Sequence, residues 1–286
     1  MNLPNVSLLT IVRGRRTHLD NLLHGVRRMT DHPLELIIIF MNEDVPTDLP
    51  QAGTVLVTER LDDPDPLPLA RARNRAAELA RGEVLLFLDV DCIPGENYAR
   101  DLAGFVRQSE GLVMGDAHYL PRDSQRNDWT EKDLDKAAEP HPRRPHLDTG
   151  ELRPTDQYHL FWSLTFGCYA TTFRKIGGFD ESYVGYGGED TDFAFRARRA
   201  GVPFFLADAR CYHQHHSTCT PPLNNLENIV TNSRLFHEKW GTWPMEGWLA
   251  AFRSMGLVEW TEEDLRLLRL PTAAEVEAHR SEDPFA

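Results

Sequence analysis

Two aspartates separated by a single residue follow a short apolar run in the first third of the chain. The run is Val84–Leu88, and Asp89 and Asp91 come directly after it with Val90 between them. Along the extended end of a strand, alternate side chains point to the same side, so the two carboxylates would converge. Paired carboxylate oxygens suit Mg²⁺ or Mn²⁺ that bridges a diphosphate. A solvated turn after a strand is the simpler alternative for the same residues.

A second acidic group follows a glycine-rich segment. Residues 185–188 are three glycines and Tyr186, and Glu189, Asp190 and Asp192 come next. Glycine lets the backbone approach a ligand closely, and a tyrosine ring offers a flat apolar face to a sugar. The acids fall in the first turn of a predicted helix, where the helix dipole stabilises their ionised forms. An ionised carboxylate beside a hydroxyl is a candidate general base, and an acidic helix cap after a flexible loop is the alternative.

A histidine-rich segment near residue 215 supplies nitrogen ligands. His213 and His216 could both point inward and complete a metal site begun by Asp91. A surface histidine cluster is one alternative. Another is a local zinc site in which Cys211 and Cys219 join the two histidines, although their spacing is tighter than usual zinc patterns.

The net charge of −13 bears on the class of ligand. It disfavours nucleic acid as a partner, because affinity for a phosphate backbone comes from clustered lysine and arginine. A diphosphate would need local cations in this negative field. Arg71, Arg73 and Asn74 open the helix that leads into the aspartate pair, and arginine binds phosphate oxygens in a bidentate manner. An ordinary exposed helix start is the alternative.

Short apolar runs alternate with amphipathic segments, and this pattern positions the motifs. We predict strands over residues 6–12, 34–40, 54–58, 84–88 and 204–206, and helices from the cap Thr17 to Val26, over 69–81 closed by Gly82, over 190–200 and over 223–239. Strands that are apolar on both faces and alternate with helices indicate an α/β fold, with a parallel sheet covered by helices on both sides.

Membrane and redox features are few. The chain has no run of about 20 apolar residues and no signal-peptide cleavage pattern near its first residue, so we expect no transmembrane segment and a cytoplasmic location. The four cysteines are scattered, which predicts free thiols.

In their order along the chain, these motifs resemble family 2 glycosyltransferases. The similarity rests on Ala72-Arg73-Asn74, Phe87 to Asp91, Gly177 to Glu181, Gly185 to Asp190 and the histidine segment. The C-terminal half is also similar to the galactosyltransferase domain of β-1,4-galactosyltransferases. The resemblance implies a GT-A fold, with a Rossmann-like, mostly parallel sheet flanked by helices and a smaller acceptor-side subregion.

The resemblance also implies roles for individual residues. The metal, Mn²⁺ or Mg²⁺, would be held by Asp91, His213 and His216, with Asp89 binding the metal or the donor's ribose. Asp190 would be the catalytic base, and the acceptor would be bound by Glu189, Tyr186, Gly187 and Gly188. The residues expected to bind the nucleotide sugar are Thr10, Val12, Arg13, Asn42, Arg71, Arg73, Asn74, Asp89, Val90 and Asp91. Family members often present an acid after the second strand, whereas this chain has Met41-Asn42-Glu43, and a UDP-sugar is still the favoured donor.

One catalytic domain over residues 1–250 is the expected organisation, since 286 residues suffice for one large core. Its parts are a nucleotide-binding half over 1–117, a proline-rich excursion over 118–157 and an acceptor and metal half over 158–250. We expect the excursion to be mobile and to become ordered on donor binding. Residues 251–286 are expected to form a helical tail.

The predicted reaction is transfer of a galactose-like or glucose-like hexose to an unknown hydroxyl acceptor, a saccharide or small glycoside, with inversion at the anomeric carbon. Three alternatives remain open at this point. They are a retaining GT-A transferase, a metal-dependent nucleotidyltransferase or sugar-nucleotide phosphohydrolase, and a carbohydrate-binding protein without catalysis.

Overall fold

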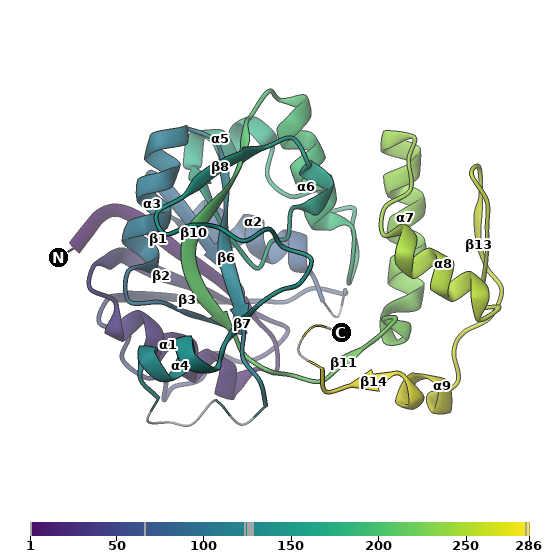
Figure 1. Ribbon diagram of the computed structural model, residues 1–286, viewed down its shortest axis with the longest axis horizontal. Coiled ribbons are helices and arrows are strands. Elements are labelled where there is room, and N and C mark those ends of the chain that lie inside the picture. Colours follow the sequence, from purple (N-terminus) through teal and green to yellow (C-terminus); the bar gives the residue numbers. More distant parts are fainter. Residues whose placement is uncertain (1, 66, 123, 125–128, 284, 286) are drawn as a thin grey trace.

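The centre of the molecule is a β-sheet with helices on both faces (Figure 1). This computed structural model describes residues 2–65, 67–122, 124, 129–283 and 285. The strands of the sheet are β1 Asn2–Val12, β2 His32–Met41, β3 Val55–Leu61, β4 Val84–Leu88, β5 Cys92–Pro94, β6 Leu112–Tyr119, β7 Glu139–Pro140, β8 Leu152–Thr155, β9 Thr165–Tyr169 and β10 Phe204–His213. The helices around it are α1 Arg16–Arg28, α2 Leu69–Leu79, α3 Tyr98–Ser109, α4 Glu131–Ala137, α5 Ala170–Ile176 and α6 Glu189–Arg199.

The strand order is β3-β2-β1-β4-β9-β6-β10-β5, with β7 beside β6 and β8 beside β10. The first four of these strands are mutually parallel, as the alternation of strands and helices predicts. Beyond them the sheet is mixed, because β9 runs antiparallel to both β4 and β6 while β6 and β10 are parallel. The start of β9 therefore lies at the same edge as the ends of β4, β6 and β10, where the predicted site residues gather.

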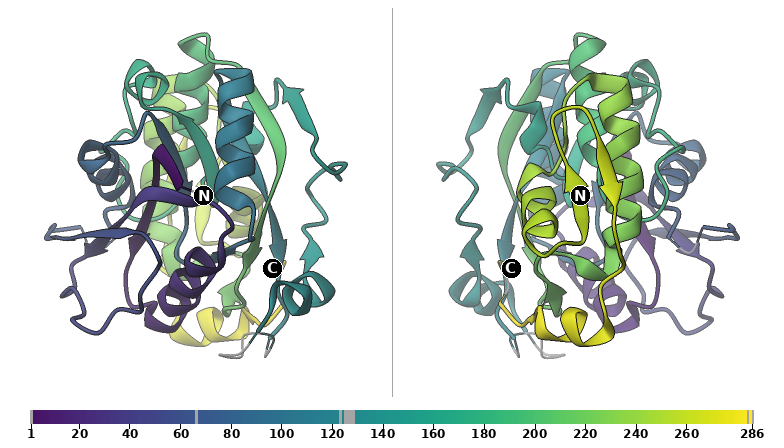
Figure 2. Two further views of the ribbon diagram at one scale, coloured as in Figure 1. Left: turned by 90° about the vertical axis from the view of Figure 1, so that its left-hand side faces the viewer. Right: turned by 90° about the vertical axis from the view of Figure 1, so that its right-hand side faces the viewer.

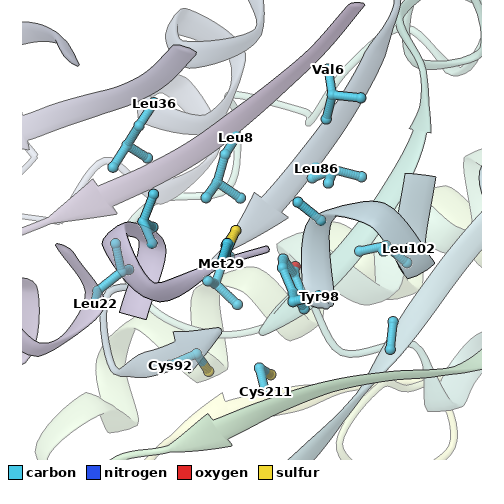
Figure 3. Close-up of a cluster of buried hydrophobic side chains, with 14 of the residues drawn as sticks. Val6, Leu8, Leu22, Met29, Leu36, Leu86, Cys92, Tyr98, Leu102 and Cys211 are labelled. Atoms are coloured by element: carbon cyan, nitrogen blue, oxygen red, sulfur yellow. The ribbon is translucent and has the colours of Figure 1, made fainter. Parts of the chain in front are cut away.

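Both faces of the sheet are buried, which explains the continuous apolar runs. Leu8, Leu36 and Leu86 lie on one face against α1 and α3, and Figure 3 shows them side by side on neighbouring strands. Their neighbours Leu9, Ile37 and Phe87 point to the other face, where α2, α5 and α6 pack. Alternate residues of one strand thus serve two separate cores.

The predicted helix ends need two corrections. Thr17 lies inside α1, which begins at Arg16 after the cap position Arg15, and no side chain caps this end. Helix α2 ends at Leu79 rather than near Gly82. Gly82 instead donates its N–H to Ser7 Oγ at 2.9 Å, and a Cβ atom there would lie 2.6 Å from the Ser7 nitrogen. Close packing against β1 therefore explains this glycine.

The excursion over 118–157 contains more structure than its composition predicts. Helix α4 lies within it, and its cap Thr130 forms a reciprocal capping box with Asp133. The strands β7 and β8 tie the excursion to β6 and β10. Residues 123 and 125–128 of the excursion lie outside the described residues. Its ordering on donor binding stays a prediction.

The remainder of the chain forms a subregion with its own core (Figure 2, right). Its elements are β11 Thr218–Cys219, α7 Leu226–Trp240, α8 Glu246–Ser254, β12 Val258–Trp260, β13 Leu265–Leu267, α9 Ala273–Ala278 and β14 Arg280–Ser281. The predicted tail boundary at residue 251 falls inside α8. The tail is also less helical than predicted, because β12 and β13 form a hairpin and β14 pairs with β11. None of the helices in the described ranges is long and apolar enough to cross a membrane.

Candidate active site

The two aspartates after β4 lie in a turn. The strand ends at Leu88, and Cys92 N donates to Asp89 O at 2.9 Å. The prediction that Asp89 and Asp91 point to the same side of an extended strand is therefore wrong. Val90 between them is 8% exposed and packs into the core on the α1 side. The turn lets each aspartate meet its own set of partners.

Asp91 meets two histidines that come from the end of β10 and the loop after it. Its Oδ1 lies 3.7 Å from His213 Nε2, and its Oδ2 lies 3.4 Å from His216 Nε2. One ligand atom from each of the three residues falls within 4.8 Å of the other two. His213 is held by strand pairing to Cys92 and to Tyr119, so the sheet itself brings it to Asp91. We call Asp91, His213 and His216 the metal triad.

The electrostatics of the triad suit a cation. Burial alone would raise the pKa of Asp91, but the neighbouring His213 and His216 hold it well below its usual range. Burial lowers the pKa of His213 to about 4, against the opposing charge of Asp91. The triad thus offers an ionised carboxylate and a neutral imidazole at neutral pH. Two nitrogen donors favour Mn²⁺ over Mg²⁺, because Mg²⁺ prefers oxygen.

The four-residue zinc alternative is wrong. Cys211 is fully buried beside Cys92 in the core (Figure 3). The Cys219 thiol points to the carbonyls of Pro221 and Val276 in the subregion after β10. No cysteine joins the triad among the residues that the structure describes. All four cysteines are free thiols, as predicted.

Arg73 links the two acidic motifs that the sequence places 100 residues apart. Its Nη2 lies 3.2 Å from Asp89 Oδ1, and its Nη1 lies 3.1 Å from Glu189 Oε1. The side chain is buried, and its guanidinium carbon stands 5.2 Å from the centre of the Phe179 ring. Asp89 therefore pairs with Arg73 and lies outside the metal triad. Arg73 is occupied by these two carboxylates, which differs from the predicted diphosphate contact.

Asp190 follows Glu189 in the first turn of α6. It accepts a hydrogen bond from Thr191 N at 2.7 Å. Burial, followed by the negative charge of Glu189, raises the pKa of Asp190 to about 7. Burial also raises the pKa of Asp89 to about 6, against the attraction of Arg73. Asp190 can therefore exchange a proton near neutral pH, as a general base must.

The glycine-rich segment before α6 needs its glycines for backbone shape. Gly187 and Gly188 have φ of 100° and 91°, in the left-handed region that favours glycine. A Cβ atom on Gly187 would lie 3.1 Å from Met245 Sδ. Asn232 of α7 donates to Gly187 O at 2.9 Å and so fixes the segment.

Tyr186 stands at the outer side of this segment with 37% of its surface exposed. Its ring stacks on Trp248 of α8, with centroids 6.1 Å apart and planes 29° apart. The sequence analysis missed Trp248, because no local motif connects α8 to residue 186. The two rings form an aromatic surface beside the acids of α6.

Asp192, the third acid of α6, has a structural role. It is fully buried and binds Trp240 Nε1 at 2.8 Å and Lys239 Nζ at 2.8 Å. Lys239 also reaches Asp180 at 2.7 Å. These contacts hold α7 against the start of α6, so Asp192 supports the site rather than facing it.

The residues predicted to line the nucleotide pocket divide into buried and exposed ones. Thr10 and Val12 are at most 2% exposed on β1, so neither residue presents surface to a ligand in this structure. Arg13 follows β1 and is exposed. Asn42, with φ of 54°, uses its amide to hold the loop at 63–65, donating to Asp65 O and accepting from Asp63 N. This structural use of Asn42 differs from the predicted nucleotide contact.

Two further predicted donor contacts are engaged elsewhere. Arg71 is half-exposed and forms an ion pair with Asp63. Asn74 donates to Phe179 O at 2.9 Å and accepts from Phe179 N at 2.8 Å. The Asn74 amide therefore fastens α2 to the Gly177–Glu181 segment, and its expected role in binding the donor stays a prediction.

Arg15 is a cation near the triad that the sequence analysis missed. Its positive charge acts on both Asp91 and His213, lowering the pKa of each. No ion pair of Arg15 is found within the described residues. His18 lies nearby on α1, with its ring 6.3 Å from that of His216. The Arg-Gly-Arg-Arg run at 13–16 was a visible signal, but only the fold shows which arginine faces the triad.

Two family models and two curated proteins are similar to this chain in sequence. Residues 64–172 match the family described as Glycosyl transferase family 2, and residues 143–217 match the N-terminal domain of galactosyltransferase. A validoxylamine A glucosyltransferase from Streptomyces hygroscopicus subsp. limoneus is 25% identical over 229 residues, which covers 72% of this chain and 50% of the relative. The protein of the same name from Streptomyces hygroscopicus subsp. jinggangensis (strain 5008) is 26% identical, with coverages of 72% and 54%. The chain thus spans about half the length of the curated relatives it matches.

Solved structures show the same fold. S. aureus TarS 1-349 superposes with a TM-score of 0.53 at 15% identity, covering 80% of this chain and 64% of TarS 1-349. GalNAc-T7, in a structure with UDP, GalNAc and Mn²⁺, gives a TM-score of 0.55 at 16% identity, covering 75% of this chain and 44% of GalNAc-T7. The class is therefore an α/β protein with the fold of GT-A glycosyltransferases. In sequence the chain is similar, more narrowly, to family 2 glycosyltransferases in one segment and to galactosyltransferases in another, which confirms the predicted resemblance.

Proposed function

We propose that this chain transfers a galactose-like or glucose-like hexose from a UDP-sugar to an acceptor hydroxyl, with inversion and with Mn²⁺ in the metal triad. One observation carries the proposal. Arg73 joins Asp89, which shares a turn with Asp91, to Glu189, which precedes Asp190. The proposed metal site and the proposed base therefore belong to one site.

The chain's own residues divide the work of a single displacement. Asp190 would accept the proton of the attacking acceptor hydroxyl, since its pKa of about 7 lets it exchange a proton at neutral pH. A cation bound by the triad would supply Lewis-acid neutralisation of the leaving diphosphate. Arg15 would add positive charge beside the leaving diphosphate. Arg71 and Arg73 would not take this role, because each already forms an ion pair with a carboxylate.

The acceptor would lie between the acids of α6 and the aromatic surface. Tyr186 and Trp248 offer an apolar face of the kind that a sugar ring stacks against. Glu189 would accept hydrogen bonds from acceptor hydroxyls, and the backbone at Gly187 and Gly188 allows close approach. This arrangement favours a saccharide or small glycoside as acceptor.

The choice of donor and metal takes support from the comparisons. GalNAc-T7 was solved with UDP and Mn²⁺, and TarS 1-349 was solved with UDP and with UDP-GlcNAc. The curated relatives are glucosyltransferases by name. A uridine nucleotide and a hexose are the choices consistent with all of them.

The test is a screen of nucleotide sugars with Mn²⁺, in which nucleoside diphosphate release is measured with and without chelator. We expect release from a UDP-hexose that is lost with chelator and enhanced by a saccharide acceptor. Release of inorganic phosphate or of nucleoside monophosphate would instead favour a phosphohydrolase or nucleotidyltransferase. Nuclear magnetic resonance of the product anomer decides between inversion and retention.

A further inference from the structure

Residues 279–283 and 285, which we call the returning segment, come back to the loop that carries His216. Strand β14 pairs antiparallel with β11, with Thr218 opposite Ser281 and Cys219 opposite Arg280. Thr220 N also donates to His279 O at 2.9 Å. Figure 1 shows β14 beside β11 below the sheet, far from the hairpin that precedes it. The pairing begins two residues after His216, so the returning segment borders the metal triad.

Glu282 contacts His215, one of the two residues between the histidine ligands. Its main-chain oxygen lies 2.8 Å from His215 Nε2, and its carboxylate lies 3.6 Å from the same nitrogen. The carboxylate also lies 3.4 Å from Arg122 Nη1. The His215 side chain is only 7% exposed. Glu282 thus joins the histidine loop to the start of the excursion.

Phe285 reaches the aromatic rings beside the triad. Its ring centre lies 5.6 Å from Tyr119 and 5.6 Å from His141. Tyr119 in turn stacks on His213 with ring centres 4.6 Å apart. The returning segment therefore contacts the surroundings of the triad at two places, the histidine loop and the Tyr119 ring.

The two histidines of the triad differ in what holds them. His213 belongs to β10 and is fixed by its neighbours in the sheet. His216 lies beyond the strand, and apart from Asp91 and neighbouring rings its only polar contact in the described ranges is with Ser217 O, at 3.2 Å. Gln214 anchors one end of this loop, accepting from Asn21 and donating to His18 O. The other end is held by β11, which pairs with the returning segment, and by His215, whose ring contacts Glu282 and whose carbonyl lies 3.3 Å from His18 Nε2.

We propose that the returning segment is a positioning element for the metal triad, which holds His216 in reach of a cation shared with Asp91 and His213. The proposal rests on the proposed metal-dependent function. Residues that orient a ligand typically change metal affinity by 10-fold to 100-fold when they are altered. A loosened His216 would leave a two-ligand site, whereas His213 would stay in place.

The experiment measures Mn²⁺ affinity of the full chain by titration followed with electron paramagnetic resonance. One variant combines Glu282→Ala with Phe285→Ala, and a second, Arg280→Pro, disrupts the pairing of β14 with β11. Leu270→Ala is the matched control, because Leu270 is 50% exposed and precedes the returning segment in the same part of the chain. We expect both test variants to bind Mn²⁺ at least about 10-fold more weakly and the control to bind like the parent.

A second measurement separates positioning from general destabilisation. In a His216→Ala background the double alanine variant should change Mn²⁺ affinity less than about twofold, because the ligand that the returning segment positions is already gone. An additive loss there would overturn the proposal. So would unchanged affinity of both test variants in a parent that binds Mn²⁺, and that result would leave the proposed function intact. A parent that binds no Mn²⁺ would contradict the metal-dependent function itself, and the positioning role with it.

Discussion

Asp91 and Asp190 are both aspartates in buried surroundings of one site, yet their environments move their pKa values in opposite directions. Two imidazoles keep the pKa of Asp91 below its usual range, despite burial. Burial and the neighbouring carboxylate of Glu189 raise the pKa of Asp190 to about 7. Asp91 therefore stays an anion that can bind a cation, while Asp190 can take up and release a proton. The partners that surround each carboxylate assign its chemistry.

Arg73 lies between these two environments and forms one ion pair in each. It neutralises Asp89 on the metal side and Glu189 on the acceptor side, and it pairs directly with neither Asp91 nor Asp190. A buried arginine beside the proposed diphosphate site therefore need not be the group that binds the diphosphate. Here it balances the charges of carboxylates that would otherwise repel one another.

Replacing Asp190 by Asn should have the largest effect on turnover. The amide cannot accept the acceptor proton, so kcat should fall by about 10²-fold to 10⁴-fold, the range for a lost general base. Mn²⁺ affinity should remain that of the parent, because Asp190 lies outside the triad. Steady-state kinetics and Mn²⁺ titration check the two statements. Near-normal turnover would remove Asp190 from the role of base.

Replacing Arg73 by Met should destroy the link between the two environments. Two carboxylates would lose a buried partner, which costs about 3–5 kcal/mol of folding free energy in comparable buried pairs. The matched control is Arg75→Met on the same helix, where the ion pairs are more exposed and worth less than about 1 kcal/mol. Urea denaturation measures both. Equal losses of folding free energy in the two variants would show that the buried Arg73 ion pairs stabilise the fold no more than the exposed pairs of Arg75.

Replacing Asp91 by Asn should weaken metal binding and leave the proposed base, Asp190, in place. Loss of the anionic ligand should weaken Mn²⁺ binding by about 100-fold or more, beyond the usual effect of a residue that only orients a ligand. Asp62→Asn, at an exposed surface position, is the control. Mn²⁺ titration is the measurement, and parental affinity in the Asp91 variant would place the metal elsewhere.

The pH dependence should show the smallest but most specific effect. Only ionised Asp190 accepts a proton, so kcat/KM should rise with pH and reach half its maximum near pH 7. Glu189→Gln removes the negative neighbour that raises this pKa, so the midpoint should move to lower pH. A pH profile for each protein checks the shift. An unmoved midpoint would assign the ionisation to another group.

The first half of the fold could be predicted from the sequence, and the second half only in part. β1, β2 and β4 appear where continuous apolar runs predicted them, because strands buried on both faces leave that pattern. No element was predicted for residues 92–117, although Tyr98, Leu102 and Val106 have the helical spacing of α3. β6 changes from fully buried to half-buried along its length, so no periodic signal marks it.

For the site, the residue types were evident from the sequence and the pairings were not. The Asp-x-Asp and histidine motifs predicted a metal group, and Asp91, His213 and His216 do meet. The contacts that Arg73, Asn74 and Asn42 make were not predicted, because each side chain binds a loop or a carboxylate remote in sequence, and their donor contacts stay predictions. Trp248 and Arg15 could not be found, since no local motif records contacts across the fold.

The sequence by itself determined an α/β sheet, two acidic motifs and a set of imidazoles, because burial and motif spacing are local properties of a chain. Tertiary structure decided which carboxylate pairs with which cation, and hence which aspartate stays charged and which takes up a proton. The physical reason is that a carboxylate's pKa depends on charges and solvent within a few ångströms, and in this chain those neighbours come from distant segments.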